Sequence, residues 1–179
     1  VLGDTALLPA PGFSAKRSDA ELREDAERIA EGLQSVKAAA DTVGAKLLYT
    51  LVPEQRTVFA EYYPDWMDDP AQDTAKNRAA LLAALEDANI PALDLTDAFR
   101  SDPDALSLYS RVDHHYTLKG AYAAYRAICE AFGLTASELT VVDAQTELFG
   151  TYNRKLYGLS PVREAMQVLE NEFPAYARF

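Results

Sequence analysis

Apolar residues recur every three or four positions over residues 19–42, which predicts a long amphipathic helix. Ser18 followed three residues later by Glu21 is a capping-box pattern, so the helix is expected to start there. Gly44 favours its end, because glycine readily adopts the left-handed conformation that follows many helices. A second helix with the same spacing is predicted over residues 73–89.

Nearly continuous apolar runs predict the strands. Residues 46–52 form such a run and are stopped by Pro53, which is typical of a strand buried on both faces of a parallel sheet. Residues 90–95 and 106–112 predict two further strands, with a short helical turn over residues 96–100 between them.

The same alternation continues to the end of the chain. Residues 117–132 predict a helix that Thr117 can cap, and residues 141–142 a short strand. We expect a loop over residues 149–155 and a last helix over residues 161–172. Because helices alternate with apolar strands, the predicted class is α/β with a mostly parallel sheet.

Length and charge narrow the functional classes. A chain of 179 residues suits a single domain with a real core. Its 28 acidic and 17 basic residues give a net charge of −11, which disfavours nucleic acid and anionic membranes as partners. No apolar run reaches the ~18 residues of a membrane-spanning helix. Because the chain opens on Val1 rather than methionine, the lack of a signal peptide is no evidence for the cytoplasm.

The single cysteine, Cys129, can form neither an intramolecular disulfide nor a thiolate metal site. Its apolar neighbours predict a small buried side chain.

The chemistry concentrates in one run, because the only two histidines, His114 and His115, are adjacent and follow Asp113. Imidazole changes protonation near neutral pH and suits proton transfer. In a loop, Asp113 can turn back to accept the imidazole N–H of His115, which predicts an orienting carboxylate and a general base for acyl transfer. The amides of Leu118 and Lys119 then open a helix, whose positive end suits a developing oxyanion.

Other interpretations of these residues stay open. Asp113, His114 and His115 could ligate a metal, but adjacent residues of an extended chain point to opposite sides, so we expect neither a metal nor a cofactor. The histidines could also merely cap and pack around the helix start. The aromatic cluster from Tyr62 to Trp66 is either a plug over the sheet or a wall for a ligand such as a sugar.

Residues 109–125, with the run Asp113-His114-His115-Tyr116 at their centre, resemble the bacterial family named for its Asp-His-His-Trp motif. That family is similar to the alginate O-acetyltransferase proteins, and both belong with the SGNH hydrolase-like proteins. Residues 53–64 and the run Phe149-Gly150-Thr151 agree with this resemblance. It implies a flavodoxin-like, three-layer SGNH hydrolase-like fold.

The resemblance also implies roles for single residues. Asp113 would orient His115, the catalytic base, and Tyr116 replaces the tryptophan of the motif but keeps an aromatic ring. In these families a serine follows on a later strand in an Asp-Ser context. This chain has no Asp-Ser pair, and only Ser137 and Ser160 follow the motif. We therefore expect a chain truncated on its C-terminal side, with an incomplete sheet, or a homologue that has lost the serine.

The predicted function is that of a carbohydrate esterase or polysaccharide O-acetyltransferase of the cell envelope. Its expected partner is an acylated carbohydrate or cell-envelope polysaccharide, at an extracellular, cell-surface or periplasmic location. Substrate binding is assigned to His114, Tyr116, Arg56 and Trp66. The alternative is a non-catalytic carbohydrate-binding or assembly protein on the same fold, since fold alone does not guarantee activity.

Overall fold

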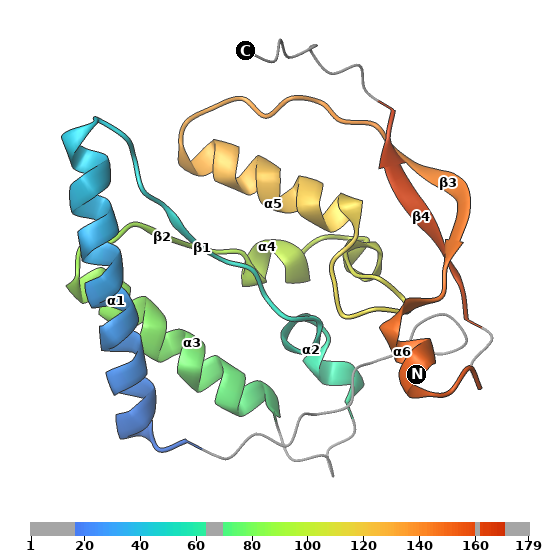
Figure 1. The fold of residues 1–179 in the computed structure, drawn as a ribbon, viewed down its shortest axis with the longest axis horizontal. Helices are drawn as coiled ribbons and strands as arrows, with labels where there is room; N and C mark the ends of the chain where they lie inside the picture. The colour runs from blue at the N-terminus through green and yellow to red at the C-terminus, as the bar shows by residue number, and fades with distance from the viewer. Residues whose placement is uncertain (1–16, 64–69, 160–161, 171–179) are drawn as a thin grey trace. The chain divides into compact units, whose positions relative to one another are not determined.

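The computed structural model describes residues 17–63, 70–159 and 162–170. Contacts between Cα atoms divide the chain into two compact units, drawn in Figure 1. The N-terminal unit comprises residues 9–101, and the C-terminal unit comprises residues 1–8 and 102–179. The expectation of one domain stays a prediction. Within the described ranges, no helix combines the length and the apolar character needed to cross a membrane.

Two long helices dominate the N-terminal unit. Helix α1 spans Asp19–Thr42, the bounds predicted from the sequence, and helix α3 spans Pro70–Asp87. The predicted capping box is present, because Glu21 N donates to Ser18 Oγ at 3.3 Å and Ser18 N donates to the Glu21 carboxylate at 2.8 Å. Small and branched side chains form the core shared by the two helices: Ala26, Ala30, Ala84, Leu85 and Ile90.

A small parallel sheet lies beside these helices. Strand β1 (Tyr49–Leu51) pairs with strand β2 (Ala92–Asp94), and Thr50 is opposite Leu93. The parallel pairing confirms the predicted α/β class. The strands are shorter than predicted, and β1 is half-buried rather than buried on both faces, because only two strands pair in this part of the described chain. Three short helical segments complete the unit: α2 (Gln55–Val58), η1 (Ala60–Tyr62) and α4 (Thr96–Arg100).

The C-terminal unit has one longer helix and one hairpin. Its elements are η2 (Ala105–Leu108), α5 (Leu118–Ala131), β3 (Val141–Leu148), α6 (Gly150–Lys155) and β4 (Glu164–Leu169). Strands β3 and β4 pair antiparallel, as the orange and red arrows of Figure 1 show. Thr117 caps α5 as predicted, accepting from Gly120 N at 3.2 Å, and Cys129 is buried as predicted.

The predicted strand over residues 106–112 is wrong. The 3₁₀ turn η2 fills its first half, and only an isolated bridge between Tyr109 and Tyr116 follows. Leu108, Tyr109 and Val112 are nevertheless buried, and Val112 is 0% exposed, whereas Leu106 is exposed. The carbonyl of Leu108 accepts from Thr117 N, and that of Val112 from Tyr152 N, so local and tertiary partners satisfy this backbone without a ladder.

Two further predictions near the C-terminus are wrong. Residues 149–155, expected as a loop, contain α6, and residues 161–172, expected as a helix, contain β4. Buried Asn153 anchors this region, since its Nδ2 donates to the Phe149 carbonyl at 2.6 Å and to the Val162 carbonyl at 2.7 Å. Pairing with β3 outweighs the weak helical spacing of β4, as tertiary context commonly does for strands.

Candidate active site

The Asp-His-His run lies in a tight loop whose two ends are joined. Tyr109 pairs with Tyr116, Ser110 N donates to the His115 carbonyl at 3.0 Å, and Thr117 N donates to the Leu108 carbonyl at 2.8 Å. These bonds close the loop directly before α5. Residues two apart in the sequence can therefore turn toward each other, as the spacing of the motif predicts.

The Asp113 carboxylate is the hub of this loop. Its Oδ1 accepts from His115 Nδ1 at 2.5 Å and from His114 N at 2.8 Å, while Oδ2 accepts from Thr151 N at 2.9 Å. Burial alone would raise the pKa of Asp113. The bonds from the Thr151 amide and hydroxyl, the His115 ring and the His114 amide outweigh burial and hold this pKa well below its usual range. Asp113 is therefore a fixed anion.

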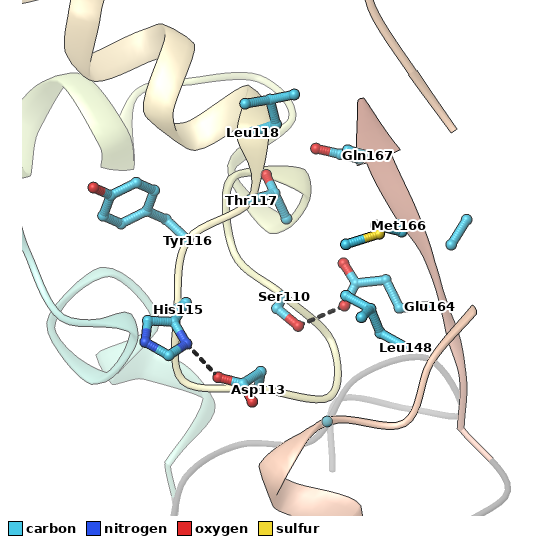
Figure 2. A pocket seen from close by; sticks show the side chains of 12 residues that line it. Ser110, Asp113, His115, Tyr116, Thr117, Leu118, Leu148, Glu164, Met166 and Gln167 are labelled. Atoms are coloured by element: carbon cyan, nitrogen blue, oxygen red, sulfur yellow. Dashed lines mark hydrogen bonds and ion pairs between the residues drawn. The ribbon is translucent and has the colours of Figure 1, made fainter. Parts of the chain in front are cut away.

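His115 presents the opposite edge of its ring. An ionised Asp113 can only accept, so in the neutral form of the His115 ring Nδ1 carries the proton and Nε2 has the lone pair. No described residue bonds to Nε2, and the side chain is 71% exposed. Figure 2 shows the ring held at one edge by Asp113. This is the arrangement that a general base needs: one nitrogen oriented, the other available.

The position of His114 differs from the prediction that the two adjacent histidines point to opposite sides. Its ring does not point away from His115, since the two ring centroids are 3.9 Å apart. His114 Nδ1 lies 3.0 Å from Asp113 Oδ1 and 3.4 Å from Thr151 Oγ1. The turn at Asp113 bends the chain, so the alternation expected of an extended segment does not apply.

Three possible metal ligands meet here. One ligand atom each from Asp113, His114 and His115 lies within 4.8 Å of the others, and the described residues add no fourth Asp, Glu, Cys or His to this group. Zinc sites commonly take three or four protein ligands. A metal at this point would compete for the nitrogen that Asp113 already engages, so the geometry fits proton transfer more directly.

Helix α6 supplies two supports that the sequence argument missed. Thr151 donates its amide to Asp113, and Gly150 before it has a φ of +71°. A Cβ on Gly150 would lie 2.1 Å from the Val112 carbonyl oxygen. Only glycine allows α6 to approach the loop this closely. The available signal was Phe149-Gly150-Thr151, which the family resemblance singled out without a role.

Glu164 of β4 is a third missed support. Its Oε2 accepts from the Ser110 hydroxyl at 2.5 Å and from Arg111 N at 2.8 Å. Ser110 Oγ in turn accepts from Val112 N at 3.2 Å. The dashed line to Ser110 in Figure 2 marks this link between hairpin and loop. Because 53 residues separate Arg111 from Glu164, no local sequence pattern could show it.

The loop, α5, β3 and β4 enclose a pocket of about 360 Å³. Its walls comprise Ser110, Asp113, His115, Tyr116, Thr117, Leu118, Leu148, Gly150, Glu164, Ala165, Met166 and Gln167. The predicted orienter and base are thus both at a cavity. Such a pocket, with apolar walls and a few fixed polar groups, suits a small organic group.

The first-turn amides of α5 are less available to an oxyanion than the sequence predicts. Gln167 Oε1 accepts from Lys119 N at 3.2 Å, and Thr117 Oγ1 accepts from Gly120 N. Two of the first-turn amides are therefore already engaged by side chains. An oxyanion at this helix end would have to displace Gln167 to use the Lys119 amide.

Of the four residues predicted to bind substrate, three lie in the described part of the chain and only one of these lines the pocket. Tyr116 lines the pocket, whereas His114 does not. Arg56 belongs to the N-terminal unit, where it pairs with Glu54 at 2.9 Å. Trp66 lies outside the described residues. Substrate binding by these four residues stays a prediction.

Comparison with known proteins places this chain in a family. Residues 13–171 match the family described as SGNH hydrolase-like domain, acetyltransferase AlgX. The chain therefore belongs to this SGNH hydrolase-like acetyltransferase family, which confirms the resemblance drawn from the Asp-His-His run. The search of curated proteins finds no match.

Solved structures agree on the fold. The O-acetyltransferase domain of Pseudomonas putida AlgJ is 21% identical, with a TM-score of 0.62, over 87% of this chain and 58% of that one. Bacillus cereus PatB1 is 19% identical, with a TM-score of 0.64, over 87% and 53%. A DHHW family protein from Eubacterium siraeum is 19% identical, with a TM-score of 0.63, over 81% and 47%. This chain thus has the predicted SGNH hydrolase-like fold and spans about half the length of these relatives.

Proposed function

We propose that this protein is a carbohydrate esterase or polysaccharide O-acetyltransferase in which Asp113 orients His115 as the general base. The single observation that carries the proposal is the 2.5 Å bond between Asp113 Oδ1 and His115 Nδ1, in a side chain that is 71% exposed. Membership of the acetyltransferase family supports the reaction class.

The reaction would proceed in two halves. His115 Nε2 takes the proton of a serine hydroxyl while the serine oxygen attacks the acyl carbonyl carbon of the donor ester. His115 then returns the proton to the departing alkoxide, which leaves as the alcohol, and the serine carries the acyl group. In the second half His115 takes the proton of a carbohydrate hydroxyl, or of water in an esterase, while its oxygen attacks the acyl-serine carbonyl. The bond from the acyl carbon to the serine oxygen breaks, and His115 returns the proton to that oxygen. Asp113 stabilises the imidazolium formed in each half.

The serine is the component that this chain does not identify. Of the serines after the motif, Ser137 uses its amide to bind the Tyr125 hydroxyl, and Ser160 lies outside the described residues. This gap favours the second candidate, a non-catalytic carbohydrate-binding or assembly protein on the same fold. Measured turnover separates the two candidates.

The decisive test uses the full-length protein and its His115→Ala variant. Hydrolysis of p-nitrophenyl acetate and acetyl transfer to oligosaccharides, read by mass spectrometry, should both fall about 10²–10⁴-fold, the usual contribution of a general base. Lys155→Ala, an exposed change on α6, serves as the matched control and should retain activity. Glycan binding without ester turnover in the unaltered protein would favour the binding protein instead.

We further propose that the protein acts outside the cytoplasm, at the cell surface or in the periplasm, on cell-envelope polysaccharide. The O-acetyltransferase domain of AlgJ among the similar folds supports an acetyl-transfer role for the family. Fractionation of cells that produce the full-length protein tests this location. Recovery only with cytoplasmic markers would contradict it.

A further inference from the structure

The pocket carries an unbalanced charge. Asp113 and Glu164 are both at its wall, and no lysine or arginine is among the described residues that line it. A site built for an anionic ligand would normally present a basic side chain, most often arginine. The charge of the pocket therefore opposes an anion.

Glu164 cannot turn away from the pocket. Its Oε2 is fixed by the Ser110 hydroxyl and by Arg111 N, and Ser110 is itself only 6% exposed. Its other oxygen, Oε1, has no hydrogen-bond partner among the described residues. A carboxylate oxygen only accepts, so Oε1 is suited to a ligand that brings a hydroxyl donor.

Two cationic side chains of this unit, those of Lys119 and Arg163, have other partners. The Lys119 ammonium lies 4.0 Å from the Asp104 carboxylate. The Arg163 guanidinium lies over the Phe149 ring, 4.4 Å from its centroid, and donates to the Val162 carbonyl. Neither side chain lines the pocket, so neither neutralises Glu164 at the place where a ligand would sit.

The remaining wall is apolar or neutral. Leu118, Leu148 and Met166 offer hydrocarbon surface. Sugar rings present C–H faces and hydroxyl edges, which match apolar walls and an acceptor oxygen respectively. A sugar carboxylate would meet two fixed negative charges and no positive one.

We propose that the preferred acyl acceptor of this protein is an uncharged glycan, from which Glu164 Oε1 accepts a hydrogen bond, and that uronate chains are poorer acceptors. This inference rests on the proposed acyl transfer. It makes Glu164 a residue that sets specificity as well as one that supports the loop.

The test compares two acceptors that differ in one group. β-1,4-linked mannohexaose and β-1,4-linked mannuronohexaose share length, linkage and ring configuration, but only the second carries carboxylates. With the full-length protein at low salt, we expect acetyl transfer to mannohexaose to exceed transfer to mannuronohexaose by about tenfold, and this ratio to fall as salt screens the repulsion.

Glu164→Gln keeps the shape of the side chain and removes its charge. It should lower the preference for the neutral acceptor at least about threefold, as expected when one of two repelling charges is lost. Glu130→Gln is the matched control, because it makes the same change on an exposed side chain of α5 outside the pocket. It should leave both the preference and the basal rate unchanged.

Each outcome has a distinct meaning. Equal or preferred use of mannuronohexaose, or a preference that Glu164→Gln leaves intact, overturns the inference while the transfer itself upholds the proposed function. If ester turnover is absent altogether, the proposed function fails. Titration calorimetry with the same two hexasaccharides then decides the inference, and tighter or equal binding of the uronate overturns it.

Discussion

Replacement of Gly150, the first residue of α6, by alanine should displace the loop that holds Asp113 and His115. Gly150 has a φ of +71°, and an added Cβ would lie 2.1 Å from the Val112 carbonyl oxygen, whereas real Cβ atoms essentially never come closer than 3.0 Å. Val112 is fully buried and its carbonyl accepts from Tyr152 N at 3.0 Å. The backbone must therefore shift by about 1 Å, which strains that bond and the neighbouring bond from Thr151 to Asp113.

Two costs add in this variant. The left-handed backbone conformation costs alanine about 1–2 kcal/mol. Overpacking against rigid backbone costs a further ~1–3 kcal/mol. We expect Gly150→Ala to lower the free energy of unfolding by about 2–5 kcal/mol, a large fraction of the stability of a small domain.

Other glycines separate the two costs. Gly133 belongs to the same unit and has a φ of +68°, but nothing lies within 4 Å of its added Cβ. Gly133→Ala should cost only the conformational part, about 1–2 kcal/mol. Gly120 in α5 presents the converse case, because its Cβ would lie 2.3 Å from the Leu108 carbonyl oxygen without a positive φ. Gly32 in α1 has neither problem, so its alanine variant should gain about 0.5–1 kcal/mol of stability.

The assay is urea unfolding at 25 °C, followed by circular dichroism, for the four variants. The contribution of the clash is the difference between Gly150→Ala and Gly133→Ala, and it should be at least about 1 kcal/mol. Equal destabilisation of the two variants would refute the close approach of α6 to the loop. Gain of stability by Gly150→Ala would refute the reasoning altogether.

Two shorter predictions concern polar groups. The folded pKa of Asp113 lies below its unfolded value, so its stabilising effect is fully present above the unfolded pKa of about 4 and is lost as the pH falls toward the folded pKa. Urea titrations should thus show Asp113→Asn destabilised by about 1–3 kcal/mol at pH 7 and less so at pH 3; a constant difference would contradict this. Asn153→Ala removes the side-chain donor of the Phe149 carbonyl and one of the two donors of the Val162 carbonyl. It should cost about 1–3 kcal/mol, read as a lower thermal midpoint; an unchanged midpoint would contradict it.

The sequence predicted those parts of the fold that depend on residues only a few positions apart. Helix α1 begins at its capping box because Ser18 and Glu21 are three residues apart, and α5 begins at Thr117 for a similar reason. The Asp113–His115 contact was also accessible, because the two residues share one loop. These features need no knowledge of distant segments.

The parts that were wrong depend on distant partners. Residues 106–112 are apolar enough for a strand, but their carbonyls bind Thr117 and Tyr152, so no ladder forms. Residues 164–169 become β4 because β3 pairs with them. The supports of the loop, Thr151 and Glu164, follow it by tens of residues. Neither spacing nor composition carries that information.

The distance along the chain between the loop and its supports has a consequence for biosynthesis. The ribosome completes Asp113 and His115 before the residues that hold them, since Thr151 follows Asp113 by 38 positions and Glu164 follows Arg111 by 53. Because a domain folds as a unit, the loop lacks the bonds from Thr151 and Glu164 to Asp113, Ser110 and Arg111 until those later residues have been synthesised. Packing of α6 and β4 against the loop supplies these bonds and fixes the Asp113 carboxylate, which orients His115. A chain damaged in that late segment would keep its histidines and lose their orientation.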